Sequence, residues 1–124
     1  MNDRYLFKAI DTNSVWRTGL LIALKGNRCA IEESDGSKWA CDAKTLCQCT
    51  GLKDKNGKLI WENDIINFKT GKAVVIWDKA EWRIKWIKDT IWRKDLHFWT
   101  NEDDWKCEVI GNIFDNKELL ESEE

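Results

Sequence analysis

Apolar residues occur in short runs along the first fifty residues, and polar turn clusters separate the runs. These runs predict strands over 5–10, 15–24, 28–32 and 38–42. Turns about every 8–12 residues are typical of a small all-β unit. Lys25-Gly26-Asn27 suits a tight hairpin loop, because Gly and Asn both tolerate positive φ. We therefore expect an N-terminal β-meander.

A second hairpin is predicted in the middle of the chain, between Leu52 and Leu59. Asn56-Gly57 is a strong hairpin signal, because a type I′ turn needs positive φ at both central residues. The polar residues around this pair predict an exposed hairpin tip. Its residues are Lys53, Asp54, Lys55, Asn56, Gly57 and Lys58.

Strands are also expected at 65–68, 73–77, 82–88 and 105–110. The run 73–77 is nearly all apolar and β-branched, which predicts a strand buried on both faces or in a barrel wall. The next strand alternates with a period of two. One face carries Trp82, Ile84, Trp86 and Lys88, and the other carries Arg83, Lys85 and Ile87.

Helical patterns are few and short. Residues 42–46 fit either one helical turn capped by Asp42 or the approach to another strand, and 116–120 fit a turn of helix. Residues 91–99 stay open between helix and strand. The whole pattern predicts a mainly β fold with little helix: a small SH3-like or pseudobarrel domain carrying an N-terminal β-meander. The chain is then one domain, 1–124, with a possible subdivision into 1–49, 50–116 and an acidic tail, 117–124.

Tryptophan content is the unusual feature of the composition, with nine Trp and no Pro. Most of these rings should lie in a core or an interface. No apolar run approaches the roughly 18–20 residues of a membrane span, and residues 1–4 lack the basic start of a signal peptide. We expect a cytoplasmic protein. Its five Cys, an odd number, should then be free thiols.

Charge is unevenly distributed, although the formal net charge is only −2. Residues 79–94 contain six basic residues and two acidic ones, whereas residues 101–124 contain nine acidic residues and two Lys. The complementary segments suit a homo-oligomer, in which the tail of one subunit meets the basic strand of another. The tail could equally fold back and mask that strand within one chain.

Trp and basic residues interleave in W-R-I-K-W-I-K-D-T-I-W-R-K, residues 82–94. Such a surface can hold nucleic acid, because cations contact phosphates and rings stack on bases at about 1–3 kcal/mol per base. It could also hold a small anionic ligand such as a nucleotide. The structural alternative is a half-buried strand with a solvated outer face. The candidate binding surface consists of Trp82, Arg83, Lys85, Trp86, Lys88, Trp92, Arg93 and Lys94.

Signatures of catalysis and metal binding are weak or missing. Cys41, Cys47 and Cys49 form C-x5-C-x-C, which does not match the usual C-x2–4-C pairing of zinc sites, and His97 and Cys107 lie far along the chain. The sequence has no phosphate-binding loop, no G-x-G-x-x-G and no H-E-x-x-H. We therefore predict a non-enzymatic protein without a metal or cofactor.

Carboxylates cluster locally in two places, at Glu62 and Asp64 and at Asp103 and Asp104. A glycosidase-like pair needs two carboxyl groups across a cleft, which local clusters do not establish. Backbone N–H groups of nearby turns are the expected partners of these side chains.

Two long motifs resemble a known family. T-G-L-K-D-K-N-G-K-L-I-W-E-N-D-I-I at 50–66 is similar to Q-Y-T-G-L-K-D-K-N-G-K-E-I-Y-E-G-D-I of the YopX family of phage and prophage proteins. E-V-I-G-N-I-F-D-N-K-E-L-L at 108–120 is similar to its E-V-I-G-N-I-Y-E-N-P-E-L-L, and F-K-A-I-D at 7–11 resembles its F-R-A-W-D more weakly. The sequence departs from the pattern at Cys47, Cys49, Asn63 and Lys117.

The resemblance implies an accessory protein of a phage or prophage, with no established activity. We expect it to bind a host or phage macromolecule, in counter-defence or regulation. The stretch 50–66 is interpreted as the hairpin that joins the two halves of the fold. Function should lie on the strands around it.

Overall fold

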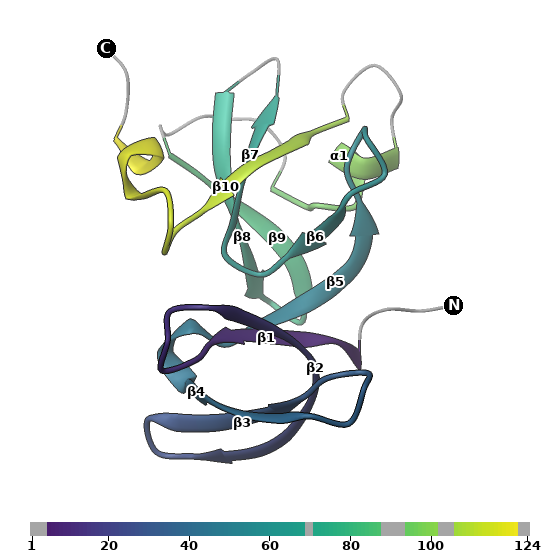
Figure 1. Ribbon diagram of the computed structural model, residues 1–124. Coiled ribbons are helices and arrows are strands. Elements are labelled where there is room, and N and C mark those ends of the chain that lie inside the picture. The colour runs from purple at the N-terminus through teal and green to yellow at the C-terminus, as the bar shows by residue number, and fades with distance from the viewer. Residues whose placement is uncertain (1–4, 69–70, 88–93, 102–105, 122–124) are drawn as a thin grey trace. The chain divides into compact units, whose positions relative to one another are not determined.

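The computed structural model describes residues 5–68, 71–87, 94–101 and 106–121 (Figure 1). The chain divides into two compact units, Met1–Cys49 and Thr50–Glu124. Strands pair antiparallel in both, and the helical turns are short. The mainly β class with little helix is therefore confirmed. None of the helices in the described ranges has the length and apolar character needed to cross a bilayer.

The first unit is the predicted meander. Its sheet has the order β4-β3-β2-β1-β5, and a 3-10 helix, η2, leads from β4 into β5. Asp42 caps η2 by accepting the Lys44 N–H, so this segment is a helical turn, one of its two expected forms. The element bounds are β1 (Phe7–Ile10), β2 (Trp16–Lys25), β3 (Arg28–Glu32), β4 (Lys38–Asp42), η2 (Ala43–Thr45) and β5 (Cys47–Lys53).

The meander curls on itself. Two strands separate β1 from β4 in the sheet, yet an isolated bridge joins Asp11 at the end of β1 to Cys41 in β4. Thr45 adds a second link, because its hydroxyl oxygen accepts the Ile10 N–H at 2.8 Å. The core between the strands contains Ala9, Cys29, Ile31 and Cys41. The link between β1 and β4 is a single bridge, so the described strands form no closed barrel.

The second unit pairs the end of β5 with β6 and adds a four-stranded sheet of order β10-β7-β8-β9. Segment 91–99, for which helix and strand both stayed open, leads into the short helix α1. Residues 91–93 lie outside the described residues. The bounds are β6 (Leu59–Trp61), β7 (Asp64–Phe68), β8 (Gly71–Asp78), β9 (Glu81–Trp86), α1 (Phe98–Asn101), β10 (Glu108–Asn112) and the 3-10 helix η4 (Lys117–Leu120).

Aromatic rings fill the core of the second unit. Phe68, Trp86 and Trp99 pack with ring centroids 4.7–5.6 Å apart. The expectation that β8 is buried on both faces is wrong, because alternate residues of this antiparallel strand face away from the core. Val75 is buried, whereas Val74 and Ile76 on the opposite face are only partly buried.

The hairpin between β5 and β6 has the predicted exposed tip, with one exception. Asp54 is only 6% exposed, so its predicted exposure is wrong. Its carboxylate accepts the N–H groups of Asn56, Lys58 and Val109, each at 2.9 Å, and these bonds replace its hydration shell.

The turn type at this tip also differs from the prediction. Gly57 has a φ of 79°, but Asn56 does not lie in the left-handed region, so the turn is not type I′. The Asp54 carbonyl accepts the Gly57 N–H at 3.0 Å and closes a turn in which one left-handed residue suffices.

Candidate functional site

The predicted binding surface divides into a buried part and an exposed part. Trp86 is 6% exposed and packs against Phe68 and Trp99 in the core, so its ring is not available for stacking on a base. Trp82 is half-buried, whereas Lys85 and Lys94 are exposed. Lys88, Trp92 and Arg93 lie outside the described residues. The predicted alternation of β9 is confirmed over the residues that the structure describes.

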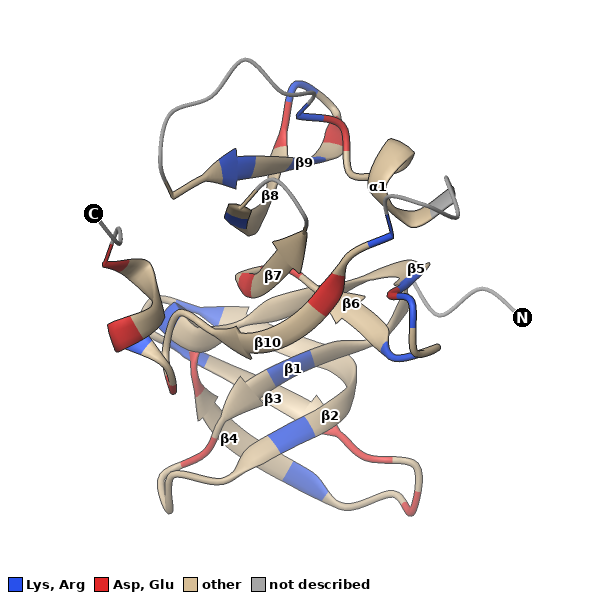
Figure 2. Cartoon of the chain, turned by 90° about the horizontal axis from the view of Figure 1, so that it is seen from above, with Lys and Arg blue, Asp and Glu red and all other residues tan. Residues whose placement is uncertain are grey.

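Basic side chains lie on the outer face of β8 and β9. Arg83 is opposite Ile76, and Lys85 is opposite Val74. The Arg83 side chain is 22% exposed, and its guanidinium lies 3.3 Å from the Glu81 carboxylate. Figure 2 shows acidic and basic residues mixed around these two strands. This face is therefore partly apolar, and the Glu81 carboxylate neutralises part of its positive charge.

The turn between β8 and β9 has an uncommon backbone. Lys79 and Ala80 have φ values of 53° and 61°, the left-handed conformation at both central positions of a type I′ turn. Non-glycine residues there cost about 1–2 kcal/mol each. The residue types predicted a turn but gave no sign of this geometry, because neither is Gly or Asn.

A tryptophan pair flanks this turn. Trp77 and Trp82 are cross-strand partners, and their rings meet edge to face with centroids 5.0 Å apart. Trp77 is 56% exposed, while Trp82 packs against the core of the unit. The Trp82 ring is therefore anchored in the core, and it contacts the exposed ring of Trp77. We name residues 77–82 the aromatic hairpin end.

Sequence reasoning missed Trp77, because the apolar run 73–77 was interpreted as buried. The alternation of β9 contained the signal. Trp82 lies at the start of that strand, so its hairpin partner must lie at the end of the preceding strand, beyond the buried residues. A large ring at such a strand end is only partly covered.

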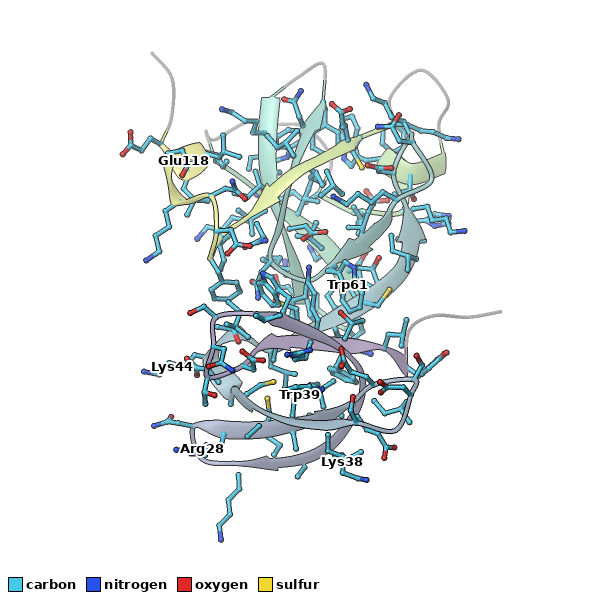
Figure 3. All side chains as sticks on the ribbon, viewed as in Figure 1. Arg28, Lys38, Trp39, Lys44, Trp61 and Glu118 are labelled. Atoms are coloured by element: carbon cyan, nitrogen blue, oxygen red, sulfur yellow. The ribbon has the colours of Figure 1, made fainter. Side chains whose placement is uncertain are left out.

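Aromatic stacking in the first unit has a structural role. The Arg17 guanidinium lies 3.4 Å from the centroid of the Trp39 ring, which is labelled in Figure 3, and its Nε donates to Asp11 at 2.8 Å. This bond to Arg17 is the largest contribution that lowers the pKa of Asp11. These contacts with Arg17 give Trp39 and the buried carboxylate of Asp11 structural roles that require no ligand.

The five cysteines are free and buried. Burial is the main cause that raises the pKa of Cys41 to about 11 and the pKa of Cys107 to about 12. Both thiols are therefore protonated at neutral pH and poorly nucleophilic. Within the described ranges, no three His, Cys, Asp or Glu side chains are arranged to hold a metal ion.

The local carboxylates act in turns where the structure describes them. Asp64 is buried and accepts the Trp61 N–H at 2.8 Å. This bond is the expected turn chemistry. Asp103 and Asp104 lie outside the described residues.

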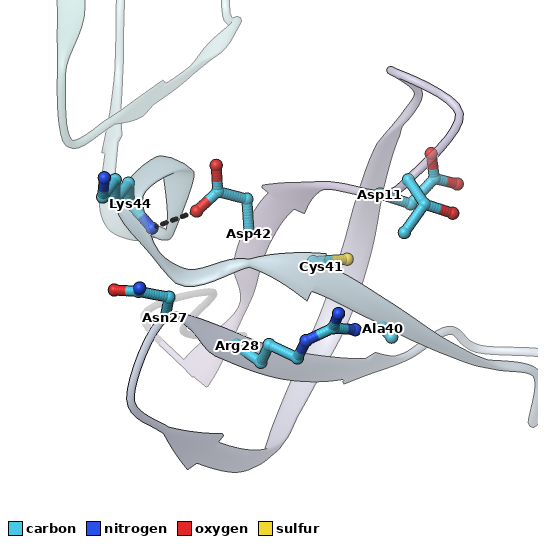
Figure 4. A pocket seen from close by; sticks show the side chains of 8 residues that line it. Asp11, Asn27, Arg28, Ala40, Cys41, Asp42 and Lys44 are labelled. Carbon is cyan, nitrogen blue, oxygen red and sulfur yellow. Dashed lines mark hydrogen bonds between the residues drawn. The ribbon is translucent and has the colours of Figure 1, made fainter.

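A cleft of about 340 Å³ lies in the first unit (Figure 4). Its lining comes from the β1–β2 turn, the β2–β3 turn, the start of β3, β4 and η2. The sequence could not predict it, because these segments are far apart along the chain. The lining residues are Asp11, Thr12, Asn27, Arg28, Ala40, Cys41, Asp42 and Lys44.

These features describe a mainly β protein that carries an exposed tryptophan pair and a cleft among its described residues. The model of the YopX protein family matches residues 8–121, so the chain belongs to that family. The crystal structure of protein EF1440 from Enterococcus faecalis has a similar fold, with a TM-score of 0.59 and 21% sequence identity. The similarity covers 93% of this chain and 96% of that one. Among the curated proteins, none matches the chain.

Proposed function

We propose that the protein is a non-enzymatic accessory protein of a phage or prophage. In this proposal it acts in the cytoplasm of the bacterial host and binds a host or phage protein, in counter-defence or regulation. The observation that carries the proposal is the exposure of Trp77 beside Trp82. Family membership supports the phage origin.

The aromatic hairpin end has the properties of a protein-binding hot spot. Trp and Arg are enriched at such sites, and a preorganised aromatic side chain loses little conformational entropy on binding. The ring of Trp82 contacts the exposed ring of Trp77, and a type I′ turn joins the two strands. The charged residues in and beside this turn are two acids and two bases: Asp78, Lys79, Glu81 and Arg83. Balanced charge favours a protein over a polyanion, which needs a net positive surface.

Nucleic acid or a nucleotide bound through residues 82–94 is the alternative. The exposed Lys85 and Lys94 support it. Two observations weigh against it: Trp86 belongs to the core, and Arg83 has Glu81 as a partner.

Self-association is a further part of the proposal. Glu118 and Glu121 of the acidic C-terminal segment are exposed, as are Lys85 and Lys94. Opposite charges on the surface of one chain can meet between two copies, where they guide association. A homo-oligomer would also cover part of the exposed apolar surface.

The test is a crosslinking capture from host lysate, with and without phage infection, using the full chain. Wild-type protein is compared with Trp77→Ala and with the control Leu120→Ala, which removes another exposed apolar side chain. A partner that wild type and Leu120→Ala retain and Trp77→Ala loses supports the proposal. Recovery of no specific partner, or equal capture by all three, contradicts it.

A second measurement tests the alternative. Anisotropy of a labelled single-stranded oligonucleotide is followed at several salt concentrations. Binding that falls steeply with salt and disappears in Arg83→Glu/Lys85→Glu would replace the protein partner by nucleic acid.

A further inference from the structure

Strand β2 pairs with different neighbours along its two halves. Residues 16–19 pair with β1, and the register of that pairing ends at Gly19. Residues 20–25 pair with β3. A Cβ at Gly19 would collide with the Glu32 carbonyl, so the glycine permits the close approach at which the second pairing begins. Among the described strands, none pairs with the other edge of residues 20–25.

The backbone of this free edge offers hydrogen-bonding groups. Lys25 and Arg28 flank a two-residue loop, so they form a hydrogen-bonded pair of the β2–β3 hairpin. Leu24 and Cys29 are the next pair. Hydrogen-bonded and non-hydrogen-bonded pairs alternate in an antiparallel ladder, so the N–H and C=O groups of Leu24 point away from β3. They are therefore placed to pair with a further strand.

The side chains along the free edge are mostly apolar. Three of them are 44–59% exposed: Leu20, Ile22 and Leu24. Residues 18–24 contain no charge and no Pro, which are the common protection of edge strands. Lys25 at the end of the strand and the irregular pairing between Leu21 and Ala23 protect the edge in part. Its free backbone groups and exposed apolar side chains nevertheless favour the addition of another strand.

Charge differs between the two ends of the β2–β3 hairpin. The loop end carries two cations and the acid that pairs with one of them across the sheet: Lys25, Arg28 and Asp42. The opposite end carries three acids and the two cations that contact them: Glu32, Glu33, Asp35, Lys38 and Arg17. The loop end is therefore weakly positive and the opposite end weakly negative. An antiparallel copy would place unlike ends together, whereas a parallel copy would place like ends together.

We propose that residues 20–25 of β2 pair with the same residues of a second copy of the chain, as antiparallel strands about a two-fold axis. One apolar edge is then its own complement, because a two-fold interface uses the same surface of both subunits. The Leu24 N–H and C=O groups bond the partner strand, and apolar side chains of the two copies cover each other. This pairing gives the self-association proposed above, on which it rests, a surface apart from the charges of Lys85 and Glu118. A strand pair this short buries a small interface, so the dimer is weak.

The experiment is sedimentation velocity of the full chain in about 0.5 M salt, which screens contacts between exposed charges. Protein concentrations from about 5 to about 500 µM bracket the dissociation constant of a small interface. Ile22→Lys and Leu24→Lys place a charge on the edge. Val15→Lys is the matched control, because Val15 is an exposed aliphatic residue of the same unit outside β2.

Circular dichroism verifies that all variants fold. We expect wild type and Val15→Lys to dimerise equally as the concentration rises. The two edge variants should dimerise at least about tenfold more weakly, because each dimer would bring two ammonium groups into an apolar contact.

Hydrogen exchange of the Leu24 amide distinguishes strand pairing from a contact between side chains alone. Pairing between copies predicts slower exchange of this amide at the higher protein concentration. In Ile22→Lys, the exchange rate of the same amide should not depend on concentration.

Three results would overturn the proposal. One is a monomer at every concentration in high salt, and another is equal dimerisation of wild type and both edge variants. The third is a dimer in which the Leu24 amide exchanges as fast as in the monomer. Oligomers that form only at low salt and are lost in Lys85→Glu would assign self-association to the charge contacts alone. Either surface can therefore fail without the other.

Discussion

The Asp54 carboxylate accepts the backbone N–H of Val109 at 2.9 Å, a contact between residues 55 positions apart. The Lys55 N–H adds a bond to the Cys107 carbonyl, and the Asn56 side chain donates to Glu108. The two long motifs that carry the family resemblance thus meet at this point. The contacts between the two motifs give these residues a structural role in the second unit that requires no ligand.

Replacement of Asp54 should destabilise the protein strongly. Asp54→Ala leaves three backbone N–H groups without their acceptor, and bonds to a charged group contribute about 1.5–3 kcal/mol each. We expect the free energy of unfolding in urea to fall by about 3 kcal/mol or more. Lys53→Ala, at an exposed neighbour, should change it by less than about 0.5 kcal/mol. Similar values for both variants would show that the carboxylate bonds contribute little.

The turn between β8 and β9 should be improvable. Lys79→Asn with Ala80→Gly supplies the residue types that a type I′ turn prefers. We expect a gain of about 1 kcal/mol in the free energy of unfolding, because relief of the left-handed strain exceeds the added entropy of the unfolded chain. The measurement is thermal unfolding of both proteins. A lower midpoint in the double variant would contradict the described turn.

Acid should weaken the first unit through Asp11. Its pKa lies below the ordinary value of 3.8, chiefly because Arg17 donates to it. A lowered pKa in the folded state contributes stability above pH 3.8, and this contribution disappears as the pH falls toward the lowered value. Asp11→Asn should therefore lose less stability than wild type between pH 5 and pH 2, measured by urea unfolding at each pH. Parallel curves would contradict the ion pair.

The thiols should be inert in the folded protein. All five are buried, and burial holds the pKa of Cys41 and Cys107 far above neutrality. We expect a thiol reagent at pH 8 to react with fewer than one thiol per chain within minutes, and with all five only in denaturant. Rapid reaction of the native protein would identify a thiol that becomes exposed.

Self-association should depend on charge. Sedimentation velocity at rising protein concentration should show oligomers that dissociate between about 0.05 and 0.5 M salt, where screening becomes short-ranged. Lys85→Glu should weaken the assembly, and adding Glu118→Lys should restore part of it. A monomer at every concentration and salt level would exclude this part of the proposal.

Local patterns predicted the meander, because Gly26 and Asn27 specify the hairpin between β2 and β3 and polar turn clusters separate the strands. They failed at Asp54, since a charged residue is expected in solvent unless distant donors are known. They failed at Trp77 for a related reason, because burial depends on what covers a strand end. The cleft required the β1–β4 seam, which only the folded chain creates.

The pairing of β10 with β7 also orders events during synthesis. Residues of the first unit have their strand partners once Gln48 has been made. In the second unit, β7 cannot pair with β10 before the strand that begins at Glu108 has been made. The Asn63 carbonyl likewise has no bond to the Ile113 N–H before that residue is made. A nascent chain that has not yet emerged beyond these residues exposes an unpaired edge and a carboxylate without its third donor. The emergence of residues 108–113 from the ribosome therefore decides when this half of the protein is protected from aggregation.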